Sequence, residues 1–389
     1  MTNNKDKKVL NVLNLRFPEF TGEWKKCIIG ELTIKVGSGV TPRGGETVYK
    51  SEGHPFVRSQ NVGLGHLILD DIAYIDEDTH QRQKNTELQL DDVLLNITGA
   101  SIGRSALVNQ QIVGGNVNQH VCIIRANKKL IPSFLCNFLL SQYGQKQIES
   151  FQAGGNRQGL NFEQIKSIKI GLPSVEEQKK IADLLLLIEQ RITTQNKIIE
   201  DLKKLKSAIR KRVFTSLKNE HTENCEINQL LAYEQPSAYI VANDEYSSDT
   251  TLTPVLTANK GFVLGYTNED FGIYQKGECI IFDDFTMDTK YVSFPFKVKS
   301  SAIKILTAKS NVNLRFMFEY LLYLELKSEE HKRHYISEIA SLVIKLPLKE
   351  KQNRIAYLMT SLDNKLVLEE NIMAKYMDEK RYILSQMFI

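Results

Sequence analysis

The chain has 389 residues, which exceeds the usual size of one hydrophobic core, so two or more domains are expected. Hydrophobic residues make up 42% and charged residues 25%, a balance that argues against a disordered, collagen-like or membrane protein. The net charge of +4 is a small difference between fifty basic and forty-six acidic residues, so it does not locate a nucleic-acid-binding surface.

The N-terminus and the cysteines bear on the cellular compartment. The first residues, MTNNKDKKVLNVLN, are basic and polar and lack the apolar segment of a signal peptide. The longest apolar run, Leu184 to Ile188, is far shorter than the roughly 18 to 20 residues that span a bilayer. The five cysteines show no paired spacing and no histidine in metal-ligand register. We therefore expect a cytoplasmic protein with reduced thiols.

The first globular region combines strand and helix patterns. Apolar and β-branched runs bounded by Gly, Asn and Asp predict strands within 54–62, 88–108 and 120–129. A helix is expected in 131–147. The region 1–173 is therefore predicted to be one mixed α/β domain.

A long helix is predicted to follow, over 174–217. Leu172 and Pro173 precede about forty residues without proline or glycine, and proline is favoured at the start of a helix. At about 1.5 Å per residue such a helix would be roughly 60 Å long. Its last part, from Lys197 to Arg212, has seven cations and two acids, which suits contact with the DNA backbone, an acidic partner or solvent.

The second half repeats this order. Strands are predicted within 252–266, 274–294 and 300–310, and a helix in 314–328, which together indicate a second mixed α/β domain over 218–347. A second long helix is predicted over 348–389, after another Leu-Pro pair.

The repeat holds a single register, an offset of 174 residues (347 − 173). FEQIKSIKIGLPSVEEQKKIADLLLLIEQRI, from Phe162, aligns without a gap with ISEIASLVIKLPLKEKQNRIAYLMTSLDNKL, from Ile336. The helices of the two halves are more alike than the globular regions. This difference indicates a shared scaffold that carries two domains with different ligands.

Apolar residues of both helices recur with the seven-residue period of a coiled coil. The predicted seam residues are Ile181, Leu185, Ile188, Ile192, Ile199 and Leu202 in the first helix and Ile355, Met359, Leu362, Leu366, Met373 and Tyr376 in the second. Polar residues interrupt both stripes at equivalent places, Gln195 and Lys206 in one and Glu369 and Lys380 in the other. Each stripe can bury the other, so we predict an antiparallel helix pair. Two roles are open for Gln195 and Glu369, setting the register or facing a partner.

No complete catalytic signature occurs in the sequence. GASIGRSA, at 99–106, is one residue short of a phosphate-binding loop and has arginine for lysine, so a turn between strands is predicted. No two prolines are adjacent, which excludes the motif of DNA amino-methyltransferases. The triplet 325–327, ELK, is expected on a helix surface, and His331 and His334 lack a partner at zinc spacing. We predict a protein that is not an enzyme and binds no metal.

Five segments carry a family resemblance: LRFPEFTGEWK, FVRSQNV, LQLDDVLLNITGASIGR and the paired helix starts LPSVEEQKKIA and LPLKEKQNRIA. Together they resemble the specificity subunits of Type I restriction-modification systems, over Leu15 to Phe388. The second half departs from the family, because Lys351 replaces the glutamate of the common Glu-Gln pair and the second recognition domain is short and poor in glycine.

The resemblance implies two target-recognition domains, each reading one half of a split site in double-stranded DNA. It implies that the two helices set the spacing and dock two methyltransferase (modification) subunits, and that restriction subunits complete the complex. S-adenosylmethionine, ATP and Mg²⁺ would then serve those partners, with no cofactor on this chain and no membrane. A spacer of roughly 60 Å suits half-sites about one DNA turn apart, about 34 to 36 Å, because each domain would overhang the spacer inward.

DNA contacts are expected from polar residues on projecting turns, with Lys or Arg nearby for phosphates. In the first domain the predicted contacts are Thr41, Arg43, Arg58, Gln60, Asn61, Ser101, Arg104, Asn156, Arg157 and Gln158. In the second domain they are Thr257, Asn259, Lys260, Lys290, Tyr291, His331, Lys332 and Arg333. For each residue a solvated loop position is the alternative.

Two other functions are compatible with parts of the sequence. A coiled-coil adaptor that never touches DNA would explain the helices but not the paired, diverged globular regions. A detached recognition module of a single-chain restriction-methyltransferase would explain both. A separate Asn-Pro-Pro-aromatic methyltransferase in a neighbouring reading frame would favour the subunit interpretation.

Overall fold

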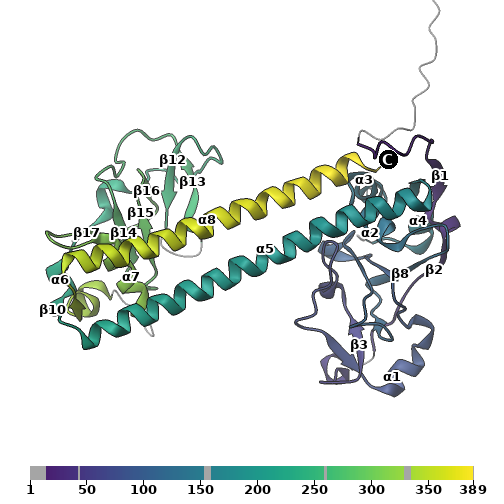
Figure 1. Ribbon diagram of the computed structural model, residues 1–389, viewed down its shortest axis with the longest axis horizontal. Coiled ribbons are helices and arrows are strands. Elements are labelled where there is room, and N and C mark those ends of the chain that lie inside the picture. Colours follow the sequence, from purple (N-terminus) through teal and green to yellow (C-terminus); the bar gives the residue numbers. More distant parts are fainter. Residues whose placement is uncertain (1–14, 43, 153–158, 258–260, 328–333, 389) are drawn as a thin grey trace, which may run out of the picture. The chain divides into compact units, whose positions relative to one another are not determined.

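The structure is a computed structural model, and it describes residues 15–42, 44–152, 159–257, 261–327 and 334–388 (Figure 1). The chain forms two compact units. Unit 1 contains residues 1–195 and 372–389, and unit 2 contains residues 196–371. Each long helix therefore contributes one part to each unit.

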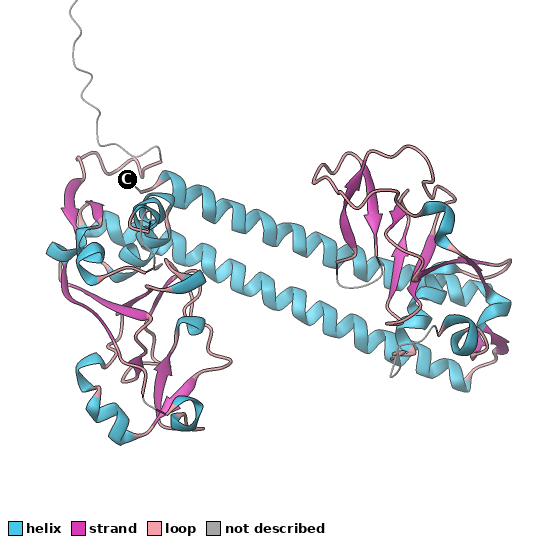
Figure 2. Ribbon diagram, turned by 180° about the vertical axis from the view of Figure 1, so that it is seen from behind, coloured by secondary structure: helices cyan, strands magenta, loops and turns pink. Residues whose placement is uncertain are grey.

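Unit 1 is built on two β-sheets and a short strand pair (Figure 2). The four-stranded sheet has the order β2 (Thr33–Ser38), β8 (Val121–Ala126), β5 (Val93–Asn96) and β6 (Ser105–Leu107). The three-stranded sheet has the order β4 (Ala73–Ile75), β3 (His54–Val57) and β7 (Asn116–Val117). Strand β1 (Lys25–Ile28) pairs antiparallel with β9 (Lys169–Leu172). The helices are α1 (Glu77–Arg82), α2 (Pro132–Leu140), α3 (Gln142–Ser150) and α4 (Phe162–Ser167).

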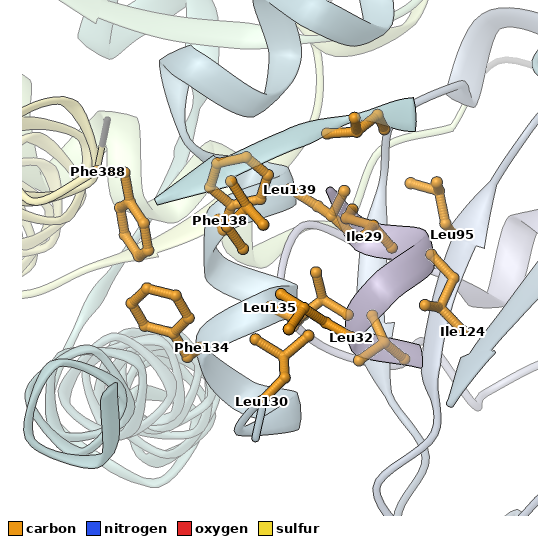
Figure 3. Packing of buried hydrophobic residues seen from close by; sticks show 14 of the residues in the cluster. Ile29, Leu32, Leu95, Ile124, Leu130, Phe134, Leu135, Phe138, Leu139 and Phe388 are labelled. Atoms are coloured by element: carbon orange, nitrogen blue, oxygen red, sulfur yellow. The ribbon is translucent and has the colours of Figure 1, made fainter. Parts of the chain in front are cut away.

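The main core of unit 1 lies where α2 packs on the four-stranded sheet and on the long helices. Phe134 and Phe138 of α2 face Phe388, with ring centroids 5.2 and 6.2 Å from that of Phe388 (Figure 3). Leu95 and Ile124 enter the same cluster from strands β5 and β8. Fully burying side chains of this size contributes about 1.5 to 3 kcal/mol each. The end of the chain is thus part of the core of unit 1.

Unit 2 has the same sheet orders in the same sequence of elements. Its four-stranded sheet runs β11 (Leu231–Glu234), β17 (Ile303–Ala308), β14 (Cys279–Asp283) and β15 (Thr289–Val292). Its three-stranded sheet runs β13 (Val263–Thr267), β12 (Thr253–Leu256) and β16 (Lys297–Val298). Strand β10 (Glu223–Glu226) pairs antiparallel with β18 (Val343–Leu346), and the helices are α6 (Ile227–Leu230), α7 (Leu314–Tyr323) and the π-helical turn η8 (Tyr335–Ile339).

Two of the predicted helices differ from the observed ones. The helix expected in 131–147 is divided into α2 and α3, because Ser141 adopts an extended backbone and its hydroxyl caps α3 by accepting from the Gly144 amide. The helix expected in 314–328 ends at Tyr323. Glu325, which we placed on a helix surface, lies beyond that end with a φ of 48°.

The two long helices are α5 (Val175–Ser216) and α8 (Lys349–Gln386). In unit 1 the guanidinium of Arg191 lies over the ring of Tyr376, and Glu189 pairs with Lys380. In unit 2 Lys203 pairs with Glu370 at 3.0 Å, and Lys206 pairs with Asp363. In each unit later positions of α5 meet earlier positions of α8, so the helices are antiparallel. The predicted fold class, mixed α/β with two globular regions and an antiparallel pair of long helices, is confirmed.

The seam residues are buried or half-buried in the structure. Ile181, Leu185 and Ile188 belong to the core of unit 1 together with residues of α2, and Ile355 and Met359 belong to the core of unit 2. The apolar stripe at the start of each helix therefore packs on a globular region as well as on the other helix.

Equivalent glutamines attach each long helix to its globular region. Gln178 and Gln352 are both almost fully buried. Gln178 accepts a hydrogen bond from the Ile131 amide at the start of α2, and Gln352 accepts one from the Asn313 amide at the start of α7. Each side chain also donates to the carbonyl of the proline five residues before it. This shared arrangement accounts for the repeated Leu-Pro and Gln spacing.

The lysines that interrupt the two stripes form equivalent ion pairs. Lys206 of α5 pairs with Asp363 of α8 in unit 2, and Lys380 of α8 pairs with Glu189 of α5 in unit 1. All four positions obey the offset of 174 residues. Ion pairs at such positions set the register of a helix pair, because a shift would leave a partly buried charge without its partner.

The neutral and acidic interruptions behave differently from the lysines. Gln195 and Glu369 are 6% and 7% exposed, and Glu369 pairs with Lys365 one turn away on the same helix. Side chains with so little exposed surface are poorly placed to face a partner. Of the two open roles for Gln195 and Glu369, the structure therefore favours setting the register of the helix pair.

A buried carboxylate joins α5 and α7 in unit 2. Glu319 has no exposed side-chain surface and pairs with Arg210 at 2.8 Å, Arg315 at 2.7 Å and Lys206 at 3.6 Å. Asp363 of α8 also pairs with Lys206 and Arg315. Three cations share two carboxylates in this network, so the loss of either carboxylate would leave the other to balance three positive charges.

We predict that Glu319→Gln lowers the free energy of unfolding by about 3 to 5 kcal/mol, because it removes the buried negative charge that balances Arg210 and Arg315. Urea denaturation followed by circular dichroism measures the change. Glu163→Gln is the matched control, since Glu163 forms an exposed pair with Lys166 and its loss should leave the midpoint unchanged. Equal effects of the two substitutions would contradict the role of Glu319.

The cysteines give a second prediction. Burial raises the pKa of the Cys136 thiol to about 11 and that of the Cys122 thiol to about 12. At pH 8 about one Cys136 side chain in a thousand would be the reactive thiolate. A thiol-specific reagent should therefore label the half-buried Cys27 and Cys225 in the native protein and the buried Cys122, Cys136 and Cys279 only after denaturation. Rapid native labelling of Cys122 or Cys136, located by peptide mass spectrometry, would contradict this.

Candidate nucleic-acid interface

Two of the turns predicted to contact DNA lie side by side in unit 1. The turn η3 (Ser59–Asn61) follows β3, and the turn η5 (Gly99–Ser101) follows β5. Asn96, the last residue of β5, donates from its side-chain nitrogen to the Ser59 carbonyl at 2.8 Å and to the Ser101 hydroxyl at 3.1 Å. One buried amide therefore connects turns from both sheets.

A third loop predicted to contact DNA, at the end of β2, lies beside the turns η3 and η5. We call these three segments and the residues that connect them the cluster. The Thr41 amide donates to the side-chain oxygen of Gln119 at 3.1 Å, and the His120 ring lies 2.6 Å from the Thr98 hydroxyl. Thr98 also bridges to Gly159, the first described residue after 153–158. Four segments far apart in sequence thus meet at one end of the four-stranded sheet.

A glycine allows the close approach in this cluster. A Cβ atom at Gly39 would lie 1.7 Å from the Val117 carbonyl oxygen, so a larger residue would push the end of β2 away from β7. Because Gly39 precedes Thr41 by two residues, its small size determines where the Thr41 loop leaves the sheet.

The cluster residues of η3 differ in their availability. Arg58 donates to the Asp71 carbonyl at 2.7 Å and to its carboxylate at 3.1 Å, and its guanidinium lies over the ring of Tyr49. Gln60 is exposed and donates to the same carboxylate at 2.6 Å. Asn61 is buried, and its side chain bonds to the Arg58 amide and the Ile68 carbonyl. Asn61 therefore holds the turn, whereas Gln60 presents its side chain to solvent.

Ser101 and Arg104 occupy the edge of the same cluster. Arg104 is exposed, and within the described ranges its guanidinium has no acidic partner. Its backbone pairs with that of Asn96, which fixes the base of the side chain. An unpaired arginine on a fixed backbone is suited to bind a phosphate.

In unit 2 the equivalent end of the sheet is more acidic. Asp283, at the position of Asn96, accepts from the amides of Phe285 and Thr286 and closes a tight turn. Asp284 and Lys304 form a buried pair at 3.3 Å, and Asp284 also accepts from the amides of His334 and Tyr335. The unit 1 residues at these two positions are Ile97 and Cys122, so the same sheet end has different chemistry in each unit.

The predicted contacts of unit 2 are placed less uniformly. Thr257 and Lys290 are half-exposed, and the Thr257 amide donates to the Phe262 carbonyl. The Tyr291 ring packs on Phe318 and under the guanidinium of Arg315, and burial raises the pKa of its phenol. Lys290 alternates with Tyr291 along β15, so the two side chains leave opposite faces of the sheet.

Several predicted contacts lie outside the described residues. These are Arg43, Asn156, Arg157, Gln158, Asn259, Lys260, His331, Lys332 and Arg333. Gly159 and His334 are the first described residues after two of these segments. Gly159 pairs with Thr98, just after β5, and His334 bonds to Asp284, just after β14.

Sequence reasoning missed three residues of the cluster, namely Asn96, Gln119 and His120. The polar run of Asn118, Gln119 and His120 between two apolar strands was the available signal for the last two. Asn96 gave no such signal, because it ends a buried strand and its role depends on contacts with residues 37 positions before it and five after it.

Among the described residues, no group of three or more His, Cys, Asp or Glu side chains is arranged to bind a metal ion. None of the helices described has the length and apolar character needed to cross a membrane.

Hollows with matching positions lie at the starts of the two long helices. In unit 1 a hollow of about 560 Å³ is lined by Arg16, Trp24, Pro173 and Glu177 among others. In unit 2 a hollow of about 300 Å³ is lined by His221, Pro347 and Gln352 among others. The repeat therefore extends to the surface around each helix start.

A family of known proteins matches nearly the whole chain. The Type I restriction modification DNA specificity domain matches residues 21–204 and again residues 219–375. The two matches cover both mixed α/β regions and much of both long helices.

Individual relatives agree with the family. The EcoR124I/EcoR124II specificity subunit of Escherichia coli is 44% identical over 127 residues, which are 31% of this chain and 31% of the relative. The putative MjaX specificity subunit of Methanocaldococcus jannaschii is 23% identical over 94% of this chain and 93% of its own length. The former likeness is local and the latter covers almost the entire protein.

The fold has solved counterparts as well. The crystal structure of a Type I restriction-modification S subunit from M. genitalium superposes with a TM-score of 0.61 at 14% identity, covering 97% of this chain and 99% of the other. The family matches the chain twice, and a relative and a solved structure each match it over nearly its full length. The chain belongs to the family of DNA specificity subunits of Type I restriction-modification systems, and it carries two specificity domains.

Proposed function

We propose that this chain selects the DNA sequence at which its restriction-modification complex acts. The regions 1–173 and 218–347 would be the two target-recognition domains, each reading one half of a bipartite site in double-stranded DNA. The proposal is carried by one observation: polar loops converge at one end of the four-stranded sheet of unit 1. The same end of the four-stranded sheet of unit 2 has different side chains, including the buried pair of Asp284 and Lys304. Different chemistry at equivalent places suits the reading of two different half-sites.

The described residues divide into two kinds of proposed contact. Gln60, Ser101, Thr41 and Gln119 have hydroxyl or amide groups on turns, which suits hydrogen bonding to base edges. Arg104 is suited to a phosphate, which fixes position but carries no sequence information. In unit 2 Thr257 and Lys290 take these roles. Asn61 and Tyr291, both packed into the protein, are left to support the loops.

The regions 174–217 and 348–389 would set the spacing between the half-sites and dock two methyltransferase subunits. The matching hollows at the two helix starts support docking of two copies of one partner. A chain from a study of complex assembly in the Type I system superposes with a TM-score of 0.56. Restriction subunits would complete the full complex in the cytoplasm.

The chemistry of such a complex lies in its other subunits. The family supplies specificity, and the cofactors of the system belong to the modification and restriction subunits. S-adenosylmethionine, ATP and Mg²⁺ would therefore bind elsewhere in the complex. The alternative function is that of a coiled-coil adaptor that binds no DNA.

Methylation mapping of the host genome with and without this gene tests the function directly. Deletion should abolish one bipartite adenine-methylation motif, whose two halves are the target of the two domains. Restoring the gene on a plasmid should restore the same motif. If every methylated motif persists without the gene, the chain does not select the site.

Arg104→Ala should weaken DNA binding of the assembled complex for cognate and unrelated sequences alike, and it should lower the slope of log affinity against log salt by about 1. Arg82→Ala is the control, because Arg82 is an exposed arginine in the last turn of α1, outside the proposed contact loops and outside both long helices. Binding measured across a salt series gives both quantities. An unchanged slope for Arg104→Ala would remove Arg104 from the phosphate contacts.

A further inference from the structure

Asn96 is an unusual residue at its place in the fold. It ends β5, the strand that lies between β8 and β6, and its neighbours Leu94, Leu95 and Ile97 are all buried and apolar. Asn96 itself is fully buried. Its side-chain oxygen has no hydrogen-bond partner among the residues that the structure describes, although buried polar atoms almost always have one. An apolar residue would avoid this cost, so the amide must serve another purpose.

The orientation of the Asn96 amide is fixed by its surroundings. The Ser59 carbonyl is an acceptor only, so the amide must turn its nitrogen, and not its oxygen, towards it. The same nitrogen has a second proton, which it donates to the Ser101 hydroxyl. Both donors are therefore used, one on each turn of the cluster.

This arrangement determines the direction of the Ser101 hydroxyl. Its oxygen accepts from Asn96, and its single proton has no acceptor among the described residues. Ser101 is half-exposed, so that proton is available to a ligand. In the major groove the matching acceptors are guanine N7 and O6, adenine N7 and thymine O4, whereas the amino group of cytosine does not match.

We propose that Asn96 is a positioning residue for sequence recognition by unit 1. It joins η3 and η5 through one amide and thereby presents Ser101 as a hydrogen-bond donor to an acceptor on DNA. This inference rests on the proposed function. The equivalent residue of unit 2, Asp283, bonds within its own turn, so the device belongs to one recognition domain only.

Two measurements on the full-length protein test the proposal. Hydrogen exchange of the free chain reports on the amides of η3 and η5, whose turns are closed by bonds such as Val62 to Ser59 and Ile102 to Gly99. Methylation by the reconstituted complex of cognate duplexes and of duplexes with one substituted base pair reports discrimination at each half-site separately. The variants are Asn96→Ala, Ser101→Ala and the double variant.

Asn96→Ala should raise exchange of both turns together by roughly tenfold and lower discrimination at one half-site by roughly tenfold, with the other half-site unchanged. Ser101→Ala keeps the amide on Ser59 and should lower discrimination at the same half-site while the exchange of η3 stays slow. The double variant should be no worse in discrimination than the worse single variant, because both remove the same contact.

Asn137→Ala is the matched control. Asn137 donates its amide to the Ser133 carbonyl within α2, a hydrogen bond that involves neither turn. It should leave both readouts unchanged, and its combination with Asn96→Ala should be additive.

Three results would overturn the inference. They are unchanged exchange in Asn96→Ala, full discrimination at both half-sites despite loosened turns, or additive losses in the double variant. A wild-type complex with no sequence preference would instead overturn the proposed function itself, so the two failures are distinguishable.

Discussion

The structure depends on the attachment of each long helix to its globular region by a buried glutamine. The side chains of Gln178 and Gln352 each donate to the carbonyl of the proline five residues before them. Each also accepts from the backbone amide at the start of a shorter helix of the globule, α2 in unit 1 and α7 in unit 2. These bonds are desolvated, so losing one would leave buried backbone groups unpaired. These bonds hold the globule at the helix start, so the loops proposed to contact DNA keep a fixed relation to the first turns of the helix in their own unit.

The helix pair adds a second constraint, on register. Apolar stripes bury one another but tolerate sliding, whereas Lys206 with Asp363 and Lys380 with Glu189 do not. The repeat is not strict where the family pattern is broken. Glu177 pairs with Arg16 at 2.7 Å in unit 1, and Lys351, the residue at the same place in unit 2, pairs with Glu220. The polarity is reversed, yet each pair still ties the start of a long helix to the first segment of its globular region.

The ends of the two four-stranded sheets show how one fold can carry two different surfaces. The strand order and the close approach of loops repeat in both units, while the side chains at the end of the central strand change from Asn96 and Ile97 to Asp283 and Asp284. Backbone pairing is insensitive to these changes, because main-chain groups make the ladder. The surface chemistry is free to differ, as the proposed reading of two half-sites requires.

The sequence alone determined the architecture, because the offset of 174 residues, the Leu-Pro helix starts and the seven-residue stripes are local patterns that survive without knowledge of contacts. It also identified the loops of Thr41, Gln60 and Ser101 as exposed and polar. Only the tertiary structure decided which of these residues are available. Asn61 is buried, Tyr291 packs on α7, and Asn96 joins two turns. Such roles arise from hydrogen bonds between residues distant in sequence, and no periodicity or composition encodes which partner a buried amide will find.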